Sequence, residues 1–274
     1  MSVKNIVKVM NFHALLRVNE ARKKVEQATK YEEELKYIIS TVVNNRIFKQ
    51  DRVSLALNKD AKELNIYIGS DLGFCANFNA DVMSYLRTDD DRNDKIIIGK
   101  RVHLNCENVV YYTDREKLDA NSGEIFEIVL NGVLARAYSK INIIYIHYYG
   151  LSQQEITKKT ILPFDQDDME DDVEKKGLRR VGHKEDFVAE GDVNYIIWNL
   201  ISVYVSMEIK VAEAWSYASE NVQRQAFTNE SLKKIEENEE NALKEARKAK
   251  HAKAFKVIVE MNNKKMREKG RKSE

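Results

Sequence analysis

The chain has 274 residues, of which 43% are hydrophobic and 32% charged, and its 45 Lys and Arg balance 44 Asp and Glu to a formal net charge of +1. Because the basic and acidic residues are almost equal in number, a global attraction to nucleic acid or to an anionic membrane is excluded, and we expect no nucleic-acid partner. Two cysteines are too few for a disulfide framework, and the five histidines lack metal-ligand spacing, so we expect no metal site.

Residues 1–58 are predicted to form a coiled-coil helix. Between Val3 and about Asn45 there is no proline or glycine, and apolar residues recur at steps of three and four. The predicted seam begins with Ile6, Val9, His13 and Leu16 and continues after a phase slip with Ala21, Val25, Ala28, Leu35, Ile39 and Val42. We therefore expect His13 to be packed in the seam of a helix about 60 Å long.

Residues 59–164 have the pattern of a small α/β domain. Short β-branched and aromatic runs predict strands at 64–70, 95–99, 108–112 and 141–149, with an edge strand at 155–164. Helical patterns lie between them at 76–87 and 123–140. This alternation predicts an open, mostly parallel, Rossmann-like sheet.

Residues 165–191 are highly charged and are predicted to be a linker. Helical periodicity returns at 192–274, with a seam of Leu200, Tyr204, Met207, Val211, Ala214 and Ala218 and then a narrower stripe of Ile235, Ala242, Ala246 and Ala249. We expect the two end helices to pair as an antiparallel coiled coil flanking the α/β domain, which places the chain in the α/β class.

The loop GSDLGFCANFNA (69–80) joins a predicted strand to a predicted helix, as a phosphate-binding loop does. It lacks both the GK[ST] and the GxGxxG spacing, so a structural turn capped by Ser70, Asp71 and Asn77 is favoured. A nucleotide or anion site remains the alternative. Cys75, near the start of the helix, is a candidate for a lowered thiol pKa, although no histidine adjoins it in the sequence.

The segment 244–274 holds twelve Lys and Arg against four Asp and Glu. Such a local excess of positive charge fits nucleic acid or phosphate groups, although Phe255 is the segment's one aromatic residue, and it fits an acidic protein partner at least as well.

Several blocks, in order along the chain, resemble the gamma subunit of F-type ATP synthases and ATPases. They are NIVKVMNFHALLRV (5–18), ARKKVEQATKYEEEL (21–35), SDLGFCANFN (70–79), HYYGLSQQEITKKTILP (147–163), AWSYASENV (214–222) and EARKAKHAKAFKVIV (245–259).

The resemblance implies that the coiled coil is the rotating shaft within a ring of alpha- and beta-type subunits, with an epsilon-like or membrane-ring component at the α/β domain. It further implies that this chain is not an enzyme and binds no cofactor, since ATP, ADP and Mg would be held by the ring subunits. The expected location is cytoplasmic and peripheral to the membrane. The residues expected to contact partners are Met10, Arg17, Asp71, Cys75, Arg247 and Lys250.

The chain departs from the family pattern at Leu72, where the family has arginine, and at Ala76, where it has glycine. Its C-terminus continues past the family's usual end with the basic segment MNNKKMREKGRKSE. These departures and the Asn-, Lys- and Ile-rich composition suggest a specialised ATPase of mycoplasma kind, such as a gliding-motility motor. The alternatives are a nucleotide-binding α/β protein that uses the 69–80 loop and a non-rotary coiled-coil adaptor.

Overall fold

The computed structural model describes residues 2–44, 57–102, 106–150, 153–163 and 193–270. Contacts divide the chain into a larger unit, Phe12–Phe227, and a smaller unit formed by Met1–Asn11 and Thr228–Glu274. The predicted linker 165–191 lies outside the described residues, and the predicted four-part division stays a prediction. The elements are α1 (Val3–Asn44), β1 (Lys62–Ile68), α3 (Phe78–Thr88), β2 (Asp94–Ile98), β3 (Val109–Thr113), η1 (Arg115–Lys117), α4 (Leu118–Leu134), β4 (Tyr138–Tyr148), β5 (Gln154–Leu162) and α6 (Val193–Gly270).

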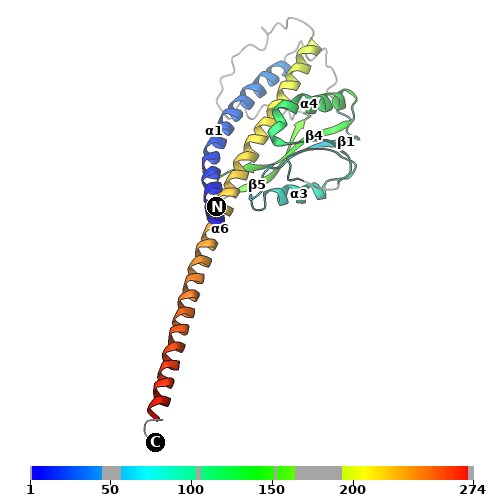
Figure 1. Ribbon diagram of the computed structural model, residues 1–274. Coiled ribbons are helices and arrows are strands. Elements are labelled where there is room, and N and C mark those ends of the chain that lie inside the picture. The colour runs from blue at the N-terminus through cyan, green and yellow to red at the C-terminus, as the bar shows by residue number, and fades with distance from the viewer. Residues whose placement is uncertain (1, 45–56, 103–105, 151–152, 164–192, 271–274) are drawn as a thin grey trace. The chain divides into compact units, whose positions relative to one another are not determined.

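Both predicted end helices are confirmed. Helix α1 has 42 residues and α6 has 78, and neither contains proline. Within the larger unit the helices pack together through a cluster that contains Val18, Ala21 and Val25 of α1 and Ala214, Ala218 and Val222 of α6, and they run antiparallel (Figure 1). Within the smaller unit the pairing is antiparallel as well, since Lys4 contacts Glu239 and Asn11 contacts Thr228.

The predicted first half of the α1 seam is wrong. Ile6, Val9, His13 and Leu16 are exposed. The buried and half-buried positions follow an unbroken heptad frame instead: Lys4, Val7, Asn11, Ala14, Val18, Ala21, Val25, Ala28, Glu32, Leu35 and Ile39. There is thus no phase slip, and polar side chains at three frame positions hide the true register from an apolar pattern search.

The seam predicted for α6 is confirmed over its first part and not over its second. Tyr204, Val211, Ala214 and Ala218 are buried in the larger unit. In the smaller unit the stripe that begins at Ile235 continues with alanines at 242, 246 and 249, all of them exposed. Between 208 and 224 most α6 residues are buried, which is typical of a helix that has neighbours on several sides.

The larger unit contains one five-stranded sheet of order β3-β2-β1-β4-β5. The first four strands are parallel and β5 is an antiparallel edge strand, so the predicted α/β class and mostly parallel sheet are confirmed. Helices α3 and α4 lie on opposite faces of this sheet (Figure 1). Leu64, Ile66 and Ile68 of β1 pack in the cluster that contains residues of α4 and α6, whereas Tyr67 packs with α3. Strand alternation thus builds two cores, one on each face.

Helix α4 both begins and ends earlier in the sequence than predicted. The sequence predicted helix at 123–140, but α4 covers Leu118–Leu134 and Tyr138 already belongs to β4. The helix stops because Arg136 adopts a left-handed φ of 52° while the N–H of Ala137 bonds to the carbonyl of Gly132 (2.9 Å). This is a Schellman cap with arginine in the place usually taken by glycine.

Candidate functional site

The carboxyl ends of strands β1 and β4 contact helix α6. In an open sheet of this order the strand sequence reverses between β1 and β4, and small ligands normally bind in the crevice at that point. Here α6 supplies the contacts: Arg224 Nε donates to the carbonyl of Gly73 in the loop after β1 (3.2 Å), and Ser219 Oγ donates to the carbonyl of Ile146 in β4 (3.1 Å). A helix of the chain itself therefore packs where a nucleotide would lie in a nucleotide-binding relative of this fold.

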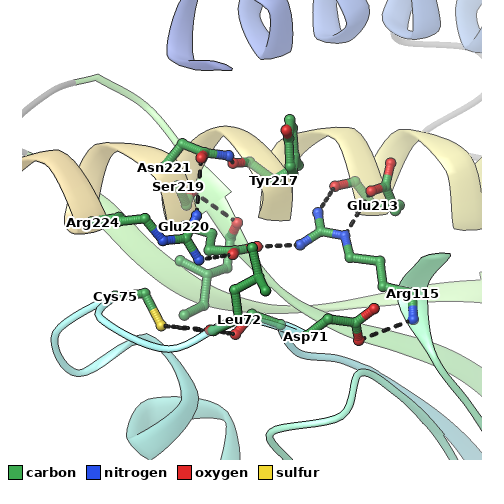
Figure 2. A network of polar contacts seen from close by, with 12 residues as sticks. Asp71, Leu72, Cys75, Arg115, Glu213, Tyr217, Ser219, Glu220, Asn221 and Arg224 are labelled. Carbon is green, nitrogen blue, oxygen red and sulfur yellow. Dashed lines mark hydrogen bonds and ion pairs between the residues drawn. The ribbon is translucent and has the colours of Figure 1, made fainter. Parts of the chain in front are cut away.

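Arg115 is the first residue of η1, which follows β3, and it is the centre of a polar network with α6 (Figure 2). Its Nε lies 2.7 Å from Glu213 Oε1, its Nη1 lies 2.5 Å from Glu220 Oε2, and its Nη2 donates to the Glu213 carbonyl (2.8 Å). The guanidinium lies over the ring of Tyr217, 5.0 Å from its centroid. Burial opposes the charged form, yet Glu213 and Glu220 raise the pKa of Arg115 above its ordinary value. The arginine is therefore always charged and uses its donors to hold α6.

Glu220 lies between two arginines. One carboxylate oxygen accepts from Arg115 and the other from Arg224 Nη2, while Arg224 Nη1 donates to Asn221 Oδ1 (3.0 Å). Only 4% of the Glu220 side chain is exposed. Removing one partner from a buried ion pair leaves an uncompensated charge, at a cost of about 3–5 kcal/mol. We call Arg115, Glu213, Glu220 and Arg224 the α6 clamp.

Asp71 fixes the backbone that presents the clamp arginine. Its carboxylate accepts three backbone N–H bonds, from Lys100 (2.9 Å), Arg115 (3.1 Å) and Glu116 (3.1 Å). Partial burial works against ionisation, but these three N–H groups lower the pKa of Asp71 below its ordinary value. The 69–80 loop thus carries an ionised carboxylate, which would repel a phosphate, and this favours the structural interpretation of the loop.

Cys75 points into the larger unit and is 3% exposed. Its Sγ lies 3.3 Å from Asn79 Nδ2 and 3.8 Å from Ser70 Oγ. Burial raises the pKa of the thiol, so the expectation of a lowered pKa is wrong. Asp71 and Cys75 both make contacts inside the chain, and their contact with a partner stays a prediction.

The outward-facing residues of this loop are ones that the sequence analysis did not choose. Leu72 is 47% exposed and Phe74 is 60% exposed, and the Phe74 ring lies 6.2 Å from the ring of Phe227 on α6. We call Leu72, Phe74 and Phe227 the loop patch. Two large apolar residues in an otherwise polar turn were the available signal, since a turn that buries Cys75 and directs Asp71 to backbone N–H groups must point some of its other side chains outward.

No described contact joins the other predicted contact residues to the 69–80 loop; these residues are Met10, Arg17, Arg247 and Lys250. Arg17 is half-buried on α1 in the larger unit, where burial raises the pKa of Tyr217 and the charge of Arg17 only partly opposes that rise. Met10 is half-buried in the smaller unit, and Arg247 and Lys250 are exposed on its part of α6. Their contacts with partners also stay predictions.

The described residues contain no group of three or more His, Cys, Asp and Glu placed to hold a metal ion. No helix among them combines the length and the apolar character needed to cross a membrane.

The family model, the curated relatives and the solved structures that match this chain all belong to ATP synthases. A family model described as ATP synthase matches residues 1–261. The ATP synthase gamma chain of Clostridium perfringens is 25% identical over 238 residues, which cover 81% of this chain and 79% of that one. The gamma chain of Clostridium acetobutylicum is 23% identical, with coverage of 85% and 81%.

Among solved structures, the chain is similar to one from the central stalk and c-ring of Tetrahymena thermophila mitochondrial ATP synthase. The TM-score is 0.56 at 14% sequence identity, and the match covers 82% of this chain and 99% of that one. At this identity the likeness concerns the fold alone.

Two long helices packed on a small α/β domain, with α6 held across the carboxyl ends of β1 and β4, define a stalk-type protein. The chain belongs to the ATP synthase family. Within that family it is a gamma subunit, as the curated relatives are.

Proposed function

We propose that this gamma subunit is the central shaft of a rotary F-type ATPase. It couples ATP hydrolysis or synthesis in a ring of alpha- and beta-type subunits to rotation, and it binds no nucleotide or metal itself, because ATP, ADP and Mg belong to the ring. The observation that carries this proposal is the α6 clamp. A shaft transmits torque only if its α/β domain cannot slip along its helix, and buried charge-assisted hydrogen bonds resist such slippage.

The partner surfaces follow from what is exposed. We assign the loop patch to contact with the ring subunits, because its apolar side chains are unusual in a turn. The exposed Arg247 and Lys250, together with Met10 and Arg17, are proposed to contact the same ring. An epsilon-like or membrane-ring component at the α/β domain completes the assembly, which places the complex at the cytoplasmic face of the membrane.

Crosslinking tests the rotary role. Phe74→Cys, in a chain with Cys75 and Cys106 replaced by alanine, is paired with a cysteine on the catalytic subunit. A rotor loses ATP turnover when the disulfide forms and regains it on reduction. Leu134→Cys is the matched control, because Leu134 is similarly exposed on α4, and it should leave turnover unchanged. Full turnover in the locked Phe74→Cys complex would instead favour a non-rotary adaptor.

The nucleotide-binding alternative predicts a different result. Calorimetry of the isolated chain with ATP, ADP and NAD should show no micromolar binding, because α6 and Asp71 already bond the groups at the crevice. Micromolar affinity that Asp71→Ala abolishes would contradict the shaft proposal.

A narrower proposal, a specialised ATPase such as a gliding-motility motor of mycoplasma kind, is supported by the composition and by the basic residues 262–274, which lie beyond the family match. The subunit composition of the native complex tests it. Recovery of a proton-translocating membrane sector and no additional subunits would contradict the specialised role and leave the shaft proposal intact.

A further inference from the structure

A second group of charges lies inside the larger unit, where α1, β5 and α6 meet. Lys159 Nζ of β5 is 2.6 Å from Glu32 Oε1 of α1 and 2.6 Å from Glu208 Oε2 of α6. Lys36 Nζ is 2.8 Å from the same Glu32 oxygen. One lysine on the edge strand therefore ties both long helices to the sheet.

The two carboxylates in this group are not equivalent. Glu32 accepts from two lysines, whereas within the described part of the chain Glu208 accepts from one, Lys159. The Glu208 side chain is 1% exposed, and its second oxygen, Oε1, is buried without a hydrogen-bond partner among the described residues. A buried oxygen with no donor is a site that a proton can occupy at low cost.

The electrostatic surroundings act in the same sense. Burial raises the pKa of Glu208, and Glu32 adds to the rise, although Lys159 opposes it. Burial acts likewise on Glu32, but Lys159 and Lys36 prevail and lower its pKa. As pH falls, Glu208 therefore takes up a proton before Glu32 does.

The neighbours on strand β4 do not supply this proton at neutral pH. Burial, together with Glu32 and Glu208, raises the pKa of Tyr145 to about 12 against the opposing effect of Lys159. Burial and Lys159 lower the pKa of His147, against Glu32, and its ring is stacked on Trp215 of α6 at 4.1 Å between centroids. The tyrosine thus keeps its proton and the histidine stays neutral.

We propose that Glu208 is a proton-operated latch between α6 and the sheet. When it is ionised, Oε2 binds α6 to β5 through Lys159. When a proton from solvent forms an O–H bond at Oε1, the Lys159–Glu208 ion pair becomes a weaker bond to a neutral acid. Lys159 keeps its own proton and its bond to Glu32, so α1 stays tied to the sheet while α6 is loosened. This latch does not depend on the rotary role.

Hydrogen exchange of the full chain tests the latch. Between about pH 8 and about pH 5, where exposed carboxylates stay ionised, protection of α6 residues 201–212 should fall about tenfold after correction for intrinsic rates. Protection of α1 residues 25–36 should stay constant. Glu208→Gln should remove the pH dependence, and Glu236→Gln, an exposed carboxylate on the same helix, should retain it.

Three results would overturn the latch: equal loss of protection in both helices, persistence of the pH dependence in Glu208→Gln, or its disappearance in His147→Phe. A measurement on the wild-type chain covers the case in which the variants do not fold. The ¹³C carboxyl signal of Glu208, assigned by through-bond transfer, should titrate above the ordinary glutamate value. A midpoint at or below about 4.3 would refute the proposal.

Discussion

At the scale of single residues, the loop after β1 combines a strained backbone with a carboxylate that accepts several hydrogen bonds. Phe74 and Ala76 have left-handed φ values of 61° and 48°, which side chains with a Cβ rarely adopt. In the same loop, Asp71 accepts hydrogen bonds from three backbone N–H groups, those of Lys100, Arg115 and Glu116, and these bonds hold the loop in place. The residue that faces inward fixes the turn, and the residues that face outward are left for contact.

Asp71→Asn should lower the free energy of unfolding at neutral pH by about 1 kcal/mol, a modest value because the site is partly screened by solvent. The folded pKa of Asp71 lies below its ordinary value, so its contribution is present above that value and is lost as pH falls through the folded pKa. The difference between wild type and variant should therefore shrink in acid. Denaturant titrations at a series of pH values measure it, and a difference independent of pH would contradict the assigned cause.

Ala76→Gly should raise the free energy of unfolding by about 0.5–1 kcal/mol, because glycine accepts the left-handed conformation without strain. Ala80→Gly is the matched control on the exposed side of α3, where loss of helix propensity should cost about 1 kcal/mol. If both substitutions destabilise the chain equally in thermal unfolding, the φ of Ala76 is not a source of strain.

At the scale of elements, Asn11 is a polar residue in the heptad frame of α1. It donates to Thr228 Oγ1 (2.9 Å) and Asn229 Oδ1 (2.8 Å) within the smaller unit. A buried asparagine in a coiled coil fixes register at some cost in stability. Asn11→Val should keep the helices paired but make their register less unique.

Disulfide trapping measures that register. Lys4→Cys with Glu239→Cys should crosslink in the parent chain, because these side chains meet. In the Asn11→Val background, Lys4→Cys should also crosslink with Ala246→Cys, one heptad away. Exclusive in-register crosslinking in that background would show that Asn11 does not set the alignment.

Much at this scale was predictable from sequence, and the failures have physical reasons. The absence of proline predicted both long helices, and β-branched runs predicted all five strands. The α1 register was missed because Asn11 and Glu32 occupy frame positions and have partners far along the chain. The α6 clamp was missed because its four charged residues resemble solvated surface charges until the fold brings them together.

At the scale of the whole molecule, the α6 clamp should affect coupling as well as stability. Arg115→Met takes one of two arginines from buried Glu220 and the ion-pair partner from half-buried Glu213, and it should lower the free energy of unfolding by about 3 kcal/mol, since Arg224 still compensates Glu220. In a complex that carries a proton-translocating sector, it should lower ATP-driven proton pumping relative to ATP hydrolysis, a quotient that we call the pumping ratio. Arg115→Met with Glu213→Met should recover part of the stability, since the carboxylate that lost its arginine is removed while Arg224 keeps Glu220.

Arg92→Met is the matched control, because Arg92 pairs with Asp90 at an exposed site where such a pair contributes little. It should change neither stability nor the pumping ratio. If Arg115→Met lowered stability and left the pumping ratio unchanged, the clamp would hold the fold together without transmitting torque.

Helix α6 also sets the order in which the chain can fold during its synthesis. Residues 214–224 of α6 pack on α1 at residues 18–25 and at the carboxyl ends of β1 and β4. They emerge from the ribosome late, so these contacts cannot form earlier in synthesis. Until then an apolar helix face and an unfilled crevice are exposed, and such intermediates aggregate easily. Because these contacts are so distant in sequence, we expect the larger unit to close in a late and slow step of folding.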